Sequence, residues 1–418
     1  MLDRTVAPAY NQDTSYSLIT PKIKKLSNGL DLVYILGGSQ DVLKVDIVFK
    51  AGRWYESKWG AAHFTAHLLS KGTKTKSSFQ IAQLFDLYGA HLEVTPGLDY
   101  ISIALYSLTK NIQPVLILLQ EILLEPAFPE KELEQAVSIY LQNLKVNLEK
   151  TSFLASKLFR STLFGATHPY GKELEEKDVK SLSRSDLKDF YNNFKDFTVF
   201  VSGRADDATE KFIESTFSAL STAIQQEKGI SRSAIKPVHN EVEKEGSVQS
   251  SIRLGKESVL RSHPDYTKII FASHILGGYF GSRLMKNIRE EKGLTYGIYA
   301  SVQPLKHAGY FVIGADVNKE NIGVTFDEIR KELNRMRTEA VPQDELLTAR
   351  NHFIGSLQSE LTTPFAHADK IKTLYLSKLP SNYYQQMINS IVNATAEDIQ
   401  RTAQAYFREE DFFEIAVG

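Results

Sequence analysis

Two hydrophobic periods alternate along the chain. Apolar residues that alternate with polar ones or run together predict strands, and such stretches cover 45–49, 100–108, 198–202, 310–316 and 412–417. Apolar residues spaced three and four apart predict helices, and the clearest stretches cover 79–88, 129–150 and 342–361. This mixture predicts an α+β fold in which helices cover one face of a mainly antiparallel sheet.

The same order of signals occurs twice. Pro129 and Pro342 each open a long helical stretch and lie 213 residues apart. The runs that begin at Ser183 and Thr395, 212 residues apart, each resemble a capping box with Asp in place of the usual Glu. A repeat of this length predicts duplicated domains rather than a solenoid, whose units are about 20 to 50 residues long.

The domain boundaries follow from this repeat and from a polar segment between its two copies. We assign residues 1–222 to an N-terminal domain and residues 246–418 to a C-terminal domain. The stretch 223–245 contains few large apolar residues, so it is predicted to be a linker.

Composition narrows the classes of partner. The chain has 418 residues, 42% of them hydrophobic and 24% charged, and a net charge of -1. These values are typical of a globular protein of two or more domains, and they give no electrostatic reason to expect nucleic acid or a membrane surface as a partner. The absence of cysteine excludes disulfides and thiolate metal sites. Because Met1 to Thr20 has no apolar core of a secretory signal, the default expectation is the cytoplasm, and the periplasm stays open.

The strongest chemical signal is the run His63-Phe64-Thr65-Ala66-His67. Two histidines four apart on a helix lie on one face and can both reach one metal ion. In the inverted zinc motif H-x-x-E-H, the glutamate before the second histidine activates the metal-bound water. Here Ala66 stands at that place and cannot accept a proton. The run by itself is compatible with a protease, the remnant of a protease, or chance.

Further motifs make the sequence resemble the pitrilysin/insulinase family of zinc metallopeptidases, in particular the branch that includes mitochondrial processing peptidase. They are the runs 68–73, Leu163-Phe164-Gly165, His168-Pro169-Tyr170-Gly171, and the glycine-rich run 277–284 leading to 288–296. The resemblance extends from about Lys25 to Gly418. It implies two homologous domains of the metallohydrolase fold, each with a mainly antiparallel sheet covered by helices.

The resemblance also implies roles for the residues of the first domain. His63 and His67 match the two metal-binding histidines, and Ala66 replaces the general base. Asn143 stands where the family has its third ligand, a glutamate. A neutral carboxamide is a poor substitute for that carboxylate, so the two histidines are interpreted as a vestigial metal site and tightly bound zinc is not expected.

In the second domain, Arg289 and Tyr296 match a pair that, in the family, reaches across to the zinc site and binds the substrate backbone. An arginine offers a fixed fork of donors and a tyrosine adds one more. Such groups can orient a carbonyl and stabilise charge on its oxygen. His91 and Glu93 match an edge strand to which a peptide can add.

Our main hypothesis is a non-catalytic subunit of a two-chain zinc peptidase. It would form a heterodimer with a homologue that has an intact H-x-x-E-H motif and supplies the zinc, although a homodimer can form in isolation. This chain would contribute Arg289 and Tyr296 and help to enclose an unfolded peptide. One alternative is a peptide-binding or structural homologue without a proteolytic role, and another is an active peptidase with a rebuilt metal site.

Overall fold

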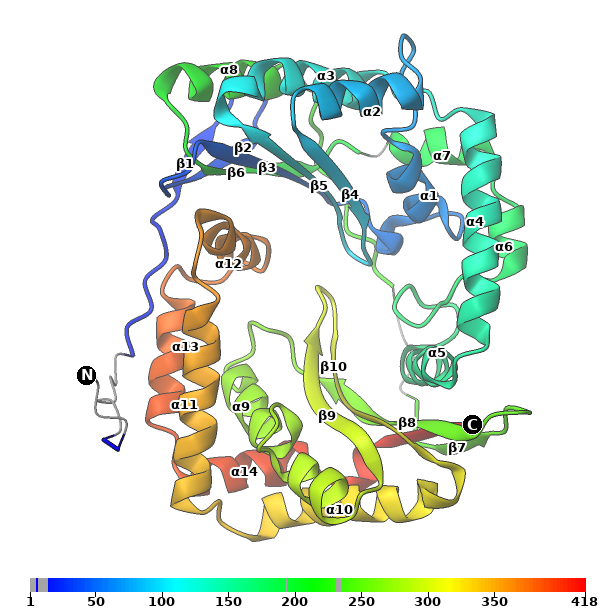
Figure 1. Cartoon of the computed structure of the whole chain (residues 1–418), viewed down its shortest axis with the longest axis vertical. Helices are drawn as coiled ribbons and strands as arrows, with labels where there is room; N and C mark the ends of the chain where they lie inside the picture. Colours follow the sequence, from blue (N-terminus) through cyan, green and yellow to red (C-terminus); the bar gives the residue numbers. More distant parts are fainter. Residues whose placement is uncertain (1–4, 7–13, 193, 231–234) are drawn as a thin grey trace.

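The computed structural model describes residues 5–6, 14–192, 194–230 and 235–418. Two halves, each built on one sheet, face each other (Figure 1). This arrangement confirms the predicted α+β class with two mainly antiparallel sheets.

The first sheet has the strand order β1-β2-β6-β3-β5-β4. Its β2 and β6 are parallel, and the other neighbouring strands are antiparallel. The strands are β1 (Lys22–Lys25), β2 (Asp31–Leu36), β3 (Val42–Phe49), β4 (His91–Pro96), β5 (Ile101–Leu108) and β6 (Phe197–Gly203). The helices of this half are η1 (Arg53–Tyr55), α1 (Ala61–Leu68), α2 (Ser78–Leu87), η2 (Thr109–Asn111), α3 (Ile112–Leu124), α4 (Glu130–Leu148), α5 (Thr151–Phe164), α6 (Glu176–Lys180), α7 (Arg184–Tyr191) and α8 (Asp207–Ser218).

The second sheet has the strand order β7-β11-β8-β10-β9, with β7 parallel to β11 and the other pairs antiparallel. The strands are β7 (His239–Val242), β8 (Gln249–Ser258), β9 (Thr295–Pro304), β10 (Gly309–Asn318) and β11 (Phe413–Val417). The helices are α9 (Tyr266–Gly277), η3 (Met285–Glu291), η4 (Lys319–Asn321), α10 (Ile322–Thr338), α11 (Gln343–Ser359), α12 (Pro364–Leu376), α13 (Tyr383–Val392), α14 (Ala396–Tyr406) and η5 (Glu409–Asp411).

The repeated capping signals fold as the sequence predicts. The Ser183 side chain accepts a hydrogen bond from the backbone N–H of Asp186, and Thr395 does the same for Asp398. In both boxes the aspartate carboxylate in turn accepts a hydrogen bond from the backbone N–H of the cap residue. Two donors at the helix terminus are thus satisfied together. Strand β7 lies within the range predicted as a linker and pairs with β11.

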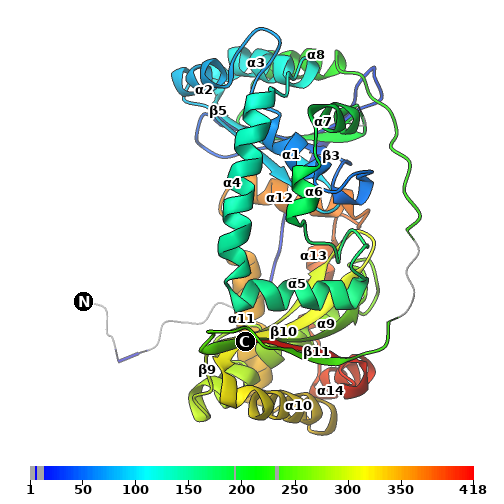
Figure 2. The ribbon, with the colours of Figure 1, turned by 90° about the vertical axis from the view of Figure 1, so that its right-hand side faces the viewer.

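The two halves exchange one helix each. α4 runs along one side of the molecule and delivers α5 to the second sheet, where α5 contacts β8 and β11 (Figures 1 and 2). α11 similarly delivers α12 to the first sheet, where Ala368 and Ile371 pack against Val33, Ile35 and Phe200. The exchange places a helix of each half against the sheet of the other, so the boundaries assigned from sequence divide the chain but not its packing.

The hairpin between β9 and β10 makes a second connection between the halves. The backbone N–H of Lys306 donates to Oδ2 of Asp99 over 3.1 Å, and the ring of His307 stacks on Trp54 at 4.1 Å. The Nζ atom of Lys306 also donates to Glu227, which follows α8, over 2.7 Å. Residues 219–230, which follow α8, descend one side of the molecule (Figure 2). Among the described residues, no helix combines the length and apolar character needed to span a membrane.

Candidate functional site

Helix α1, which carries the histidine pair, begins at an anchored turn. Gly60 precedes it with φ 94°, a conformation that favours glycine. The Glu56 carboxylate accepts the backbone N–H groups of Gly60 and Ala62 over 3.0 and 2.9 Å. Burial raises the pKa of Glu56 to about 7, although these backbone bonds and Arg53 act in the opposite direction. The start of α1 is therefore fixed by a half-buried acid.

His63 and His67 lie on the same side of α1. Their rings are parallel, with centroids 6.5 Å apart. His63 is half-buried and His67 is exposed. Burial, with smaller contributions from His67 and Arg53, lowers the pKa of His63 to about 4. Burial also lowers the pKa of His67, so both rings are mainly neutral at pH 7.

Ala66 and Asn143, which the resemblance matches to two carboxylates, lie in opposite environments. Ala66 is completely buried, since α1 packs between α4 and α7. Asn143 on α4 is exposed. The ring that meets His63 is instead that of Tyr140, with centroids 5.2 Å apart and planes at 69°. Sequence reasoning missed Tyr140, which lies one helical turn before Asn143.

The residues at this crossing do not fit a catalytic zinc ion. Catalytic zinc is normally held by three protein ligands and needs a nearby base. Here one of the two imidazoles, that of His63, meets a tyrosine ring, and an alanine methyl group occupies the place that the motif gives to the base. Within the described ranges, no group of three or more His, Cys, Asp or Glu side chains is arranged to hold a metal ion.

The second half presents a different constellation. Arg289 lies on η3, a π-helical turn, which is a type of turn frequent at functional sites. Its guanidinium carbon lies 4.8 Å from the ring centroid of Phe280 and 5.1 Å from that of Tyr296. Phe280 is 61% exposed and Tyr296 is 90% exposed. The structure thus brings Arg289 and Tyr296 together and adds Phe280, an aromatic residue of the glycine-rich run that sequence reasoning passed over.

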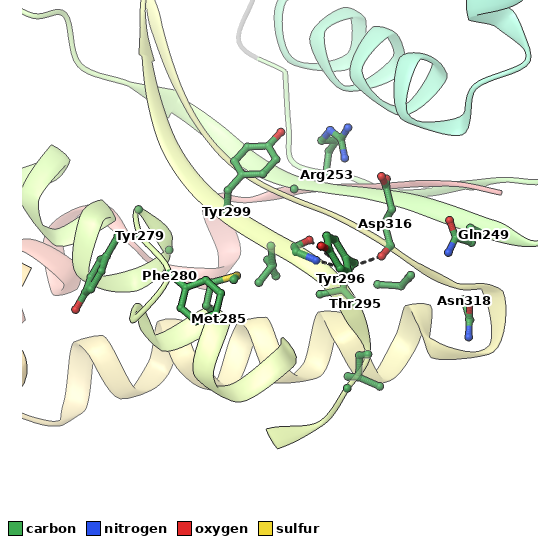
Figure 3. Close-up of a pocket in the computed structure, with 18 residues that line it drawn as sticks. Gln249, Arg253, Tyr279, Phe280, Met285, Thr295, Tyr296, Tyr299, Asp316 and Asn318 are labelled. Atoms are coloured by element: carbon green, nitrogen blue, oxygen red, sulfur yellow. Dashed lines mark hydrogen bonds between the residues drawn. The ribbon is translucent and has the colours of Figure 1, made fainter. Parts of the chain in front are cut away.

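A cavity of about 800 Å³ adjoins this stack at the edge of the second sheet (Figure 3). Its lining includes Phe280, Tyr296, Tyr299 and Asp316. The ring of Tyr299 crosses the backbone of Gly314, where an added Cβ would lie 2.6 Å from the tyrosine Oη. Glycine at that point of β10 therefore lets Tyr299 lie flat and keeps the cavity open.

In each half, one of the two edge strands of the sheet carries candidate residues. β4 is the last strand of the first sheet and carries His91 and Glu93 as the sequence predicts. β9 is the last strand of the second sheet and carries Tyr296. Among the described residues, no hydrogen bond or ring contact joins the histidine pair to Arg289 or Tyr296. The two candidate sites are therefore separate in this chain.

Two family models match the chain. The model for insulinase (peptidase family M16) matches residues 36–173, and the model for the peptidase M16 inactive domain matches residues 181–353. The chain belongs to the insulinase family, peptidase family M16. This confirms the predicted family, and the branch that includes mitochondrial processing peptidase stays a prediction.

Some similar proteins are named as zinc proteases, and another is named as a non-peptidase homolog. An uncharacterized zinc protease of Rickettsia bellii is 26% identical over 395 residues, which cover 92% of this chain and 94% of the relative. The non-peptidase homolog YmxG of Helicobacter pylori is 23% identical over 376 residues, covering 87% and 85%. A peptidase M16 inactive domain from Pseudomonas fluorescens has a similar fold, with a TM-score of 0.87, 22% identity and coverage of 95% and 98%.

Proposed function

We propose that this chain is a non-catalytic insulinase-family protein that acts as one subunit of a two-chain zinc peptidase. In this role it provides Arg289 and Tyr296 to a site whose zinc and general base belong to a homologue with an intact H-x-x-E-H motif. The observation that carries the proposal is the contrast between a buried Ala66 and a half-buried Arg289 that lies over two exposed aromatic rings.

The geometry of the stack supports a role for Arg289 in binding a peptide carbonyl. Stacking uses the face of a guanidinium and leaves the N–H groups along its edge available. Rings on Phe280 and Tyr296 therefore limit the motion of the arginine without occupying its donors. Donors held in this way can bind an oxygen on which negative charge develops.

The free strand edges support a role in holding an extended peptide. A peptide added to a sheet edge gains backbone hydrogen bonds regardless of its sequence. β9 carries such an edge beside the cavity and the Tyr296 ring. A second candidate function, peptide binding without proteolysis, is favoured by the same edges and requires no catalytic partner.

The test is co-expression with a complete H-x-x-E-H homologue and an assay of peptide cleavage by the complex. Loss of one donor to a developing oxyanion typically lowers kcat by about 10² to 10³. We expect a loss of this size in the double variant Arg289→Ala, Tyr296→Phe. Arg204→Ala serves as the matched control, because Arg204 is an exposed arginine in the first half. Unchanged activity in the double variant would show that the assigned role is wrong.

Two further measurements separate the alternatives. Size-exclusion chromatography of each variant with its partner shows whether a loss of activity reflects failed assembly. Metal analysis and a protease assay on the isolated chain test the rebuilt-site alternative, which requires stoichiometric zinc and turnover that a chelator stops. A stable homodimer that binds peptide and joins no catalytic homologue would favour the second candidate.

A further inference from the structure

A cluster of three rings lies where α9 meets α11. The Nε2 atom of His274 and the Nδ1 atom of His352 are 3.2 Å apart, and their ring centroids are separated by 5.1 Å. Tyr279 stacks against both rings, with centroids 4.8 Å from each. The contact between the nitrogens is a hydrogen bond in which one ring donates and the other accepts. Two ligating atoms therefore already point at each other.

This crossing repeats the architecture of the histidine pair in the first half. α9 packs on α11 and β9 in the second half as α1 packs on α4 and β4 in the first. Ser356 lies 213 residues after Asn143, and its Oγ atom is 3.5 Å from Nδ1 of His352. The same helix crossing that lost its carboxylates in one half thus brings two imidazoles together in the other.

We propose that His274 and His352 form a two-histidine chelate for a divalent transition-metal ion of the zinc, nickel and copper class. Two nitrogens that each lie about 2.0–2.1 Å from one ion are roughly 3.4 Å apart at a tetrahedral angle and about 2.9 Å apart at a right angle. The observed 3.2 Å falls between these values. An ion can therefore enter between the rings with small side-chain movements.

The proton balance of this step needs no additional base. Each neutral imidazole carries one proton and can hold it on either ring nitrogen. The ring that now donates moves its proton to its other nitrogen through exchange with water, and both facing nitrogens then offer lone pairs. Water supplies the remaining ligands, and Ser356 lies beside them. Tyr279 limits rotation of both imidazoles from one side.

The His63–His67 pair is less suited to the same task. Its ring centroids are 6.5 Å apart, against 5.1 Å for His274 and His352, and the rings are parallel. The Tyr140 ring also meets His63 edge to face. A metal ion added to this chain should therefore bind in the second half, away from the motif that suggests zinc in the sequence.

Calorimetric titration of the full chain, purified with a chelator and then freed of it, tests the site. Each chain should bind one zinc ion or one nickel ion. Magnesium prefers oxygen ligands and should not bind. Loss of even an outer-shell partner weakens metal binding about 10- to 100-fold, so His352→Gln should weaken zinc binding at least tenfold. His352 is exposed, so this variant should keep the fold, which circular dichroism checks.

Matched controls make the result specific. His91→Gln removes another exposed histidine, and the double variant His63→Gln, His67→Gln removes the first-half pair. Both should bind zinc like the unaltered chain, while His274→Gln should reproduce the loss seen with His352→Gln. The proposal is overturned by the absence of saturable binding, by an affinity that neither His274→Gln nor His352→Gln changes, or by a loss that follows the His63/His67 variant instead.

Discussion

The helix crossing around His63 and the turn around Arg289 show two fates of functional residues within one duplicated fold. In the first, a buried Ala66 and an exposed Asn143 stand where the resemblance predicts carboxylates in the family. In the second, the guanidinium of Arg289 lies over the exposed rings of Phe280 and Tyr296. The start of the histidine helix is held by hydrogen bonds to Glu56. The two regions therefore differ in the chemistry of a few side chains, while the two halves share one framework.

The largest expected effect tests whether the two halves depend on one framework. Phe159 on α5 is 2% exposed and would be only 2.6 Å from a Cβ added to Gly255 in β8. Phe159→Ala should lower the free energy of unfolding by about 3–5 kcal/mol, because a large aromatic side chain leaves a packed core. Urea unfolding followed by circular dichroism measures the loss.

Helix α12, which packs on the first sheet as α5 packs on the second, provides the matched variant. Ile371 on α12 is 5% exposed against the first sheet, and Ile371→Ala should cost about 2–4 kcal/mol. Because the exchanged helices join the halves, both variants should shift one shared transition. Two separate transitions, each sensitive to only one variant, would mean that the halves are independent and that the shared-framework comparison fails.

The second prediction concerns the lost carboxylates. Ala66→Glu should destabilise the protein by about 2–4 kcal/mol, since it places a carboxyl group in a fully buried position without an evident partner. Asn143→Glu, at an exposed position on the same crossing, should change stability by no more than about 0.5 kcal/mol. Thermal and urea unfolding of the two single variants measure the difference.

The double variant Ala66→Glu, Asn143→Glu extends this test to metal binding. A carboxylate at 143 together with His63 and His67 would complete a three-ligand set. If the decay of the site is local, calorimetry should detect one more zinc ion per chain in the double variant than in the unaltered chain. An Ala66→Glu protein as stable as the unaltered chain would contradict the burial argument and show that this position opens toward the histidines.

Much of the fold could be predicted from the sequence because its signals are local. The capping boxes at Ser183 and Thr395 and the prolines at 129 and 342 act within one or two turns, so pattern reasoning located their helices. The exchange of α5 and α12 depends on contacts between residues far apart in the sequence, and hydrophobic periodicity does not indicate such contacts. β7 was missed because its four exposed or half-buried residues have no apolar face.

The candidate sites show the same limit. Motif spacing located His63, His67, Arg289 and Tyr296, whose types carry obvious chemistry. The aromatic rings that contact them, on Tyr140 and Phe280, could not be distinguished from ordinary core aromatics by their sequence. The His274–His352 pair joins two helices 78 residues apart, so only the packing of α9 on α11 brings it together.

The third prediction concerns acid and the connection between the halves. Burial opposes ionisation of Glu227, but hydrogen bonds from Lys306, Lys50 and Tyr55 outweigh it and lower the pKa to about 2. An unfolded glutamate titrates near about 4.3. The stabilising contribution is therefore present above pH ~4.3 and is lost as the pH falls toward ~2.

Glu227→Gln should accordingly cost about 1 kcal/mol at pH 7 and nothing near pH 2, a magnitude reduced because the side chain is 45% exposed. Urea unfolding at several pH values measures this dependence. Glu134→Gln, at an exposed position of α4, is the control and should follow the unaltered chain at every pH. If the free energies of unfolding of Glu227→Gln and the unaltered chain differ by the same amount at every pH in this range, ionisation of Glu227 is excluded as the source of the difference.

The smallest expected effect examines what holds Arg289 in place. A cation over an exposed aromatic ring is worth about 0.5–1 kcal/mol, so a double-mutant cycle of Phe280→Ala and Arg289→Ala should give a coupling of that size. Phe79→Ala with Arg289→Ala is the control cycle, because Phe79 is 75% exposed on α2 in the other half and its coupling should be zero.

If Phe280 only orients the arginine, Phe280→Ala should weaken peptide cleavage by the proposed two-chain complex less than Arg289→Ala does. A Phe280→Ala loss equal to that of Arg289→Ala would make the ring a substrate contact in its own right, and the second site would then be an aromatic surface rather than a single positioned charge.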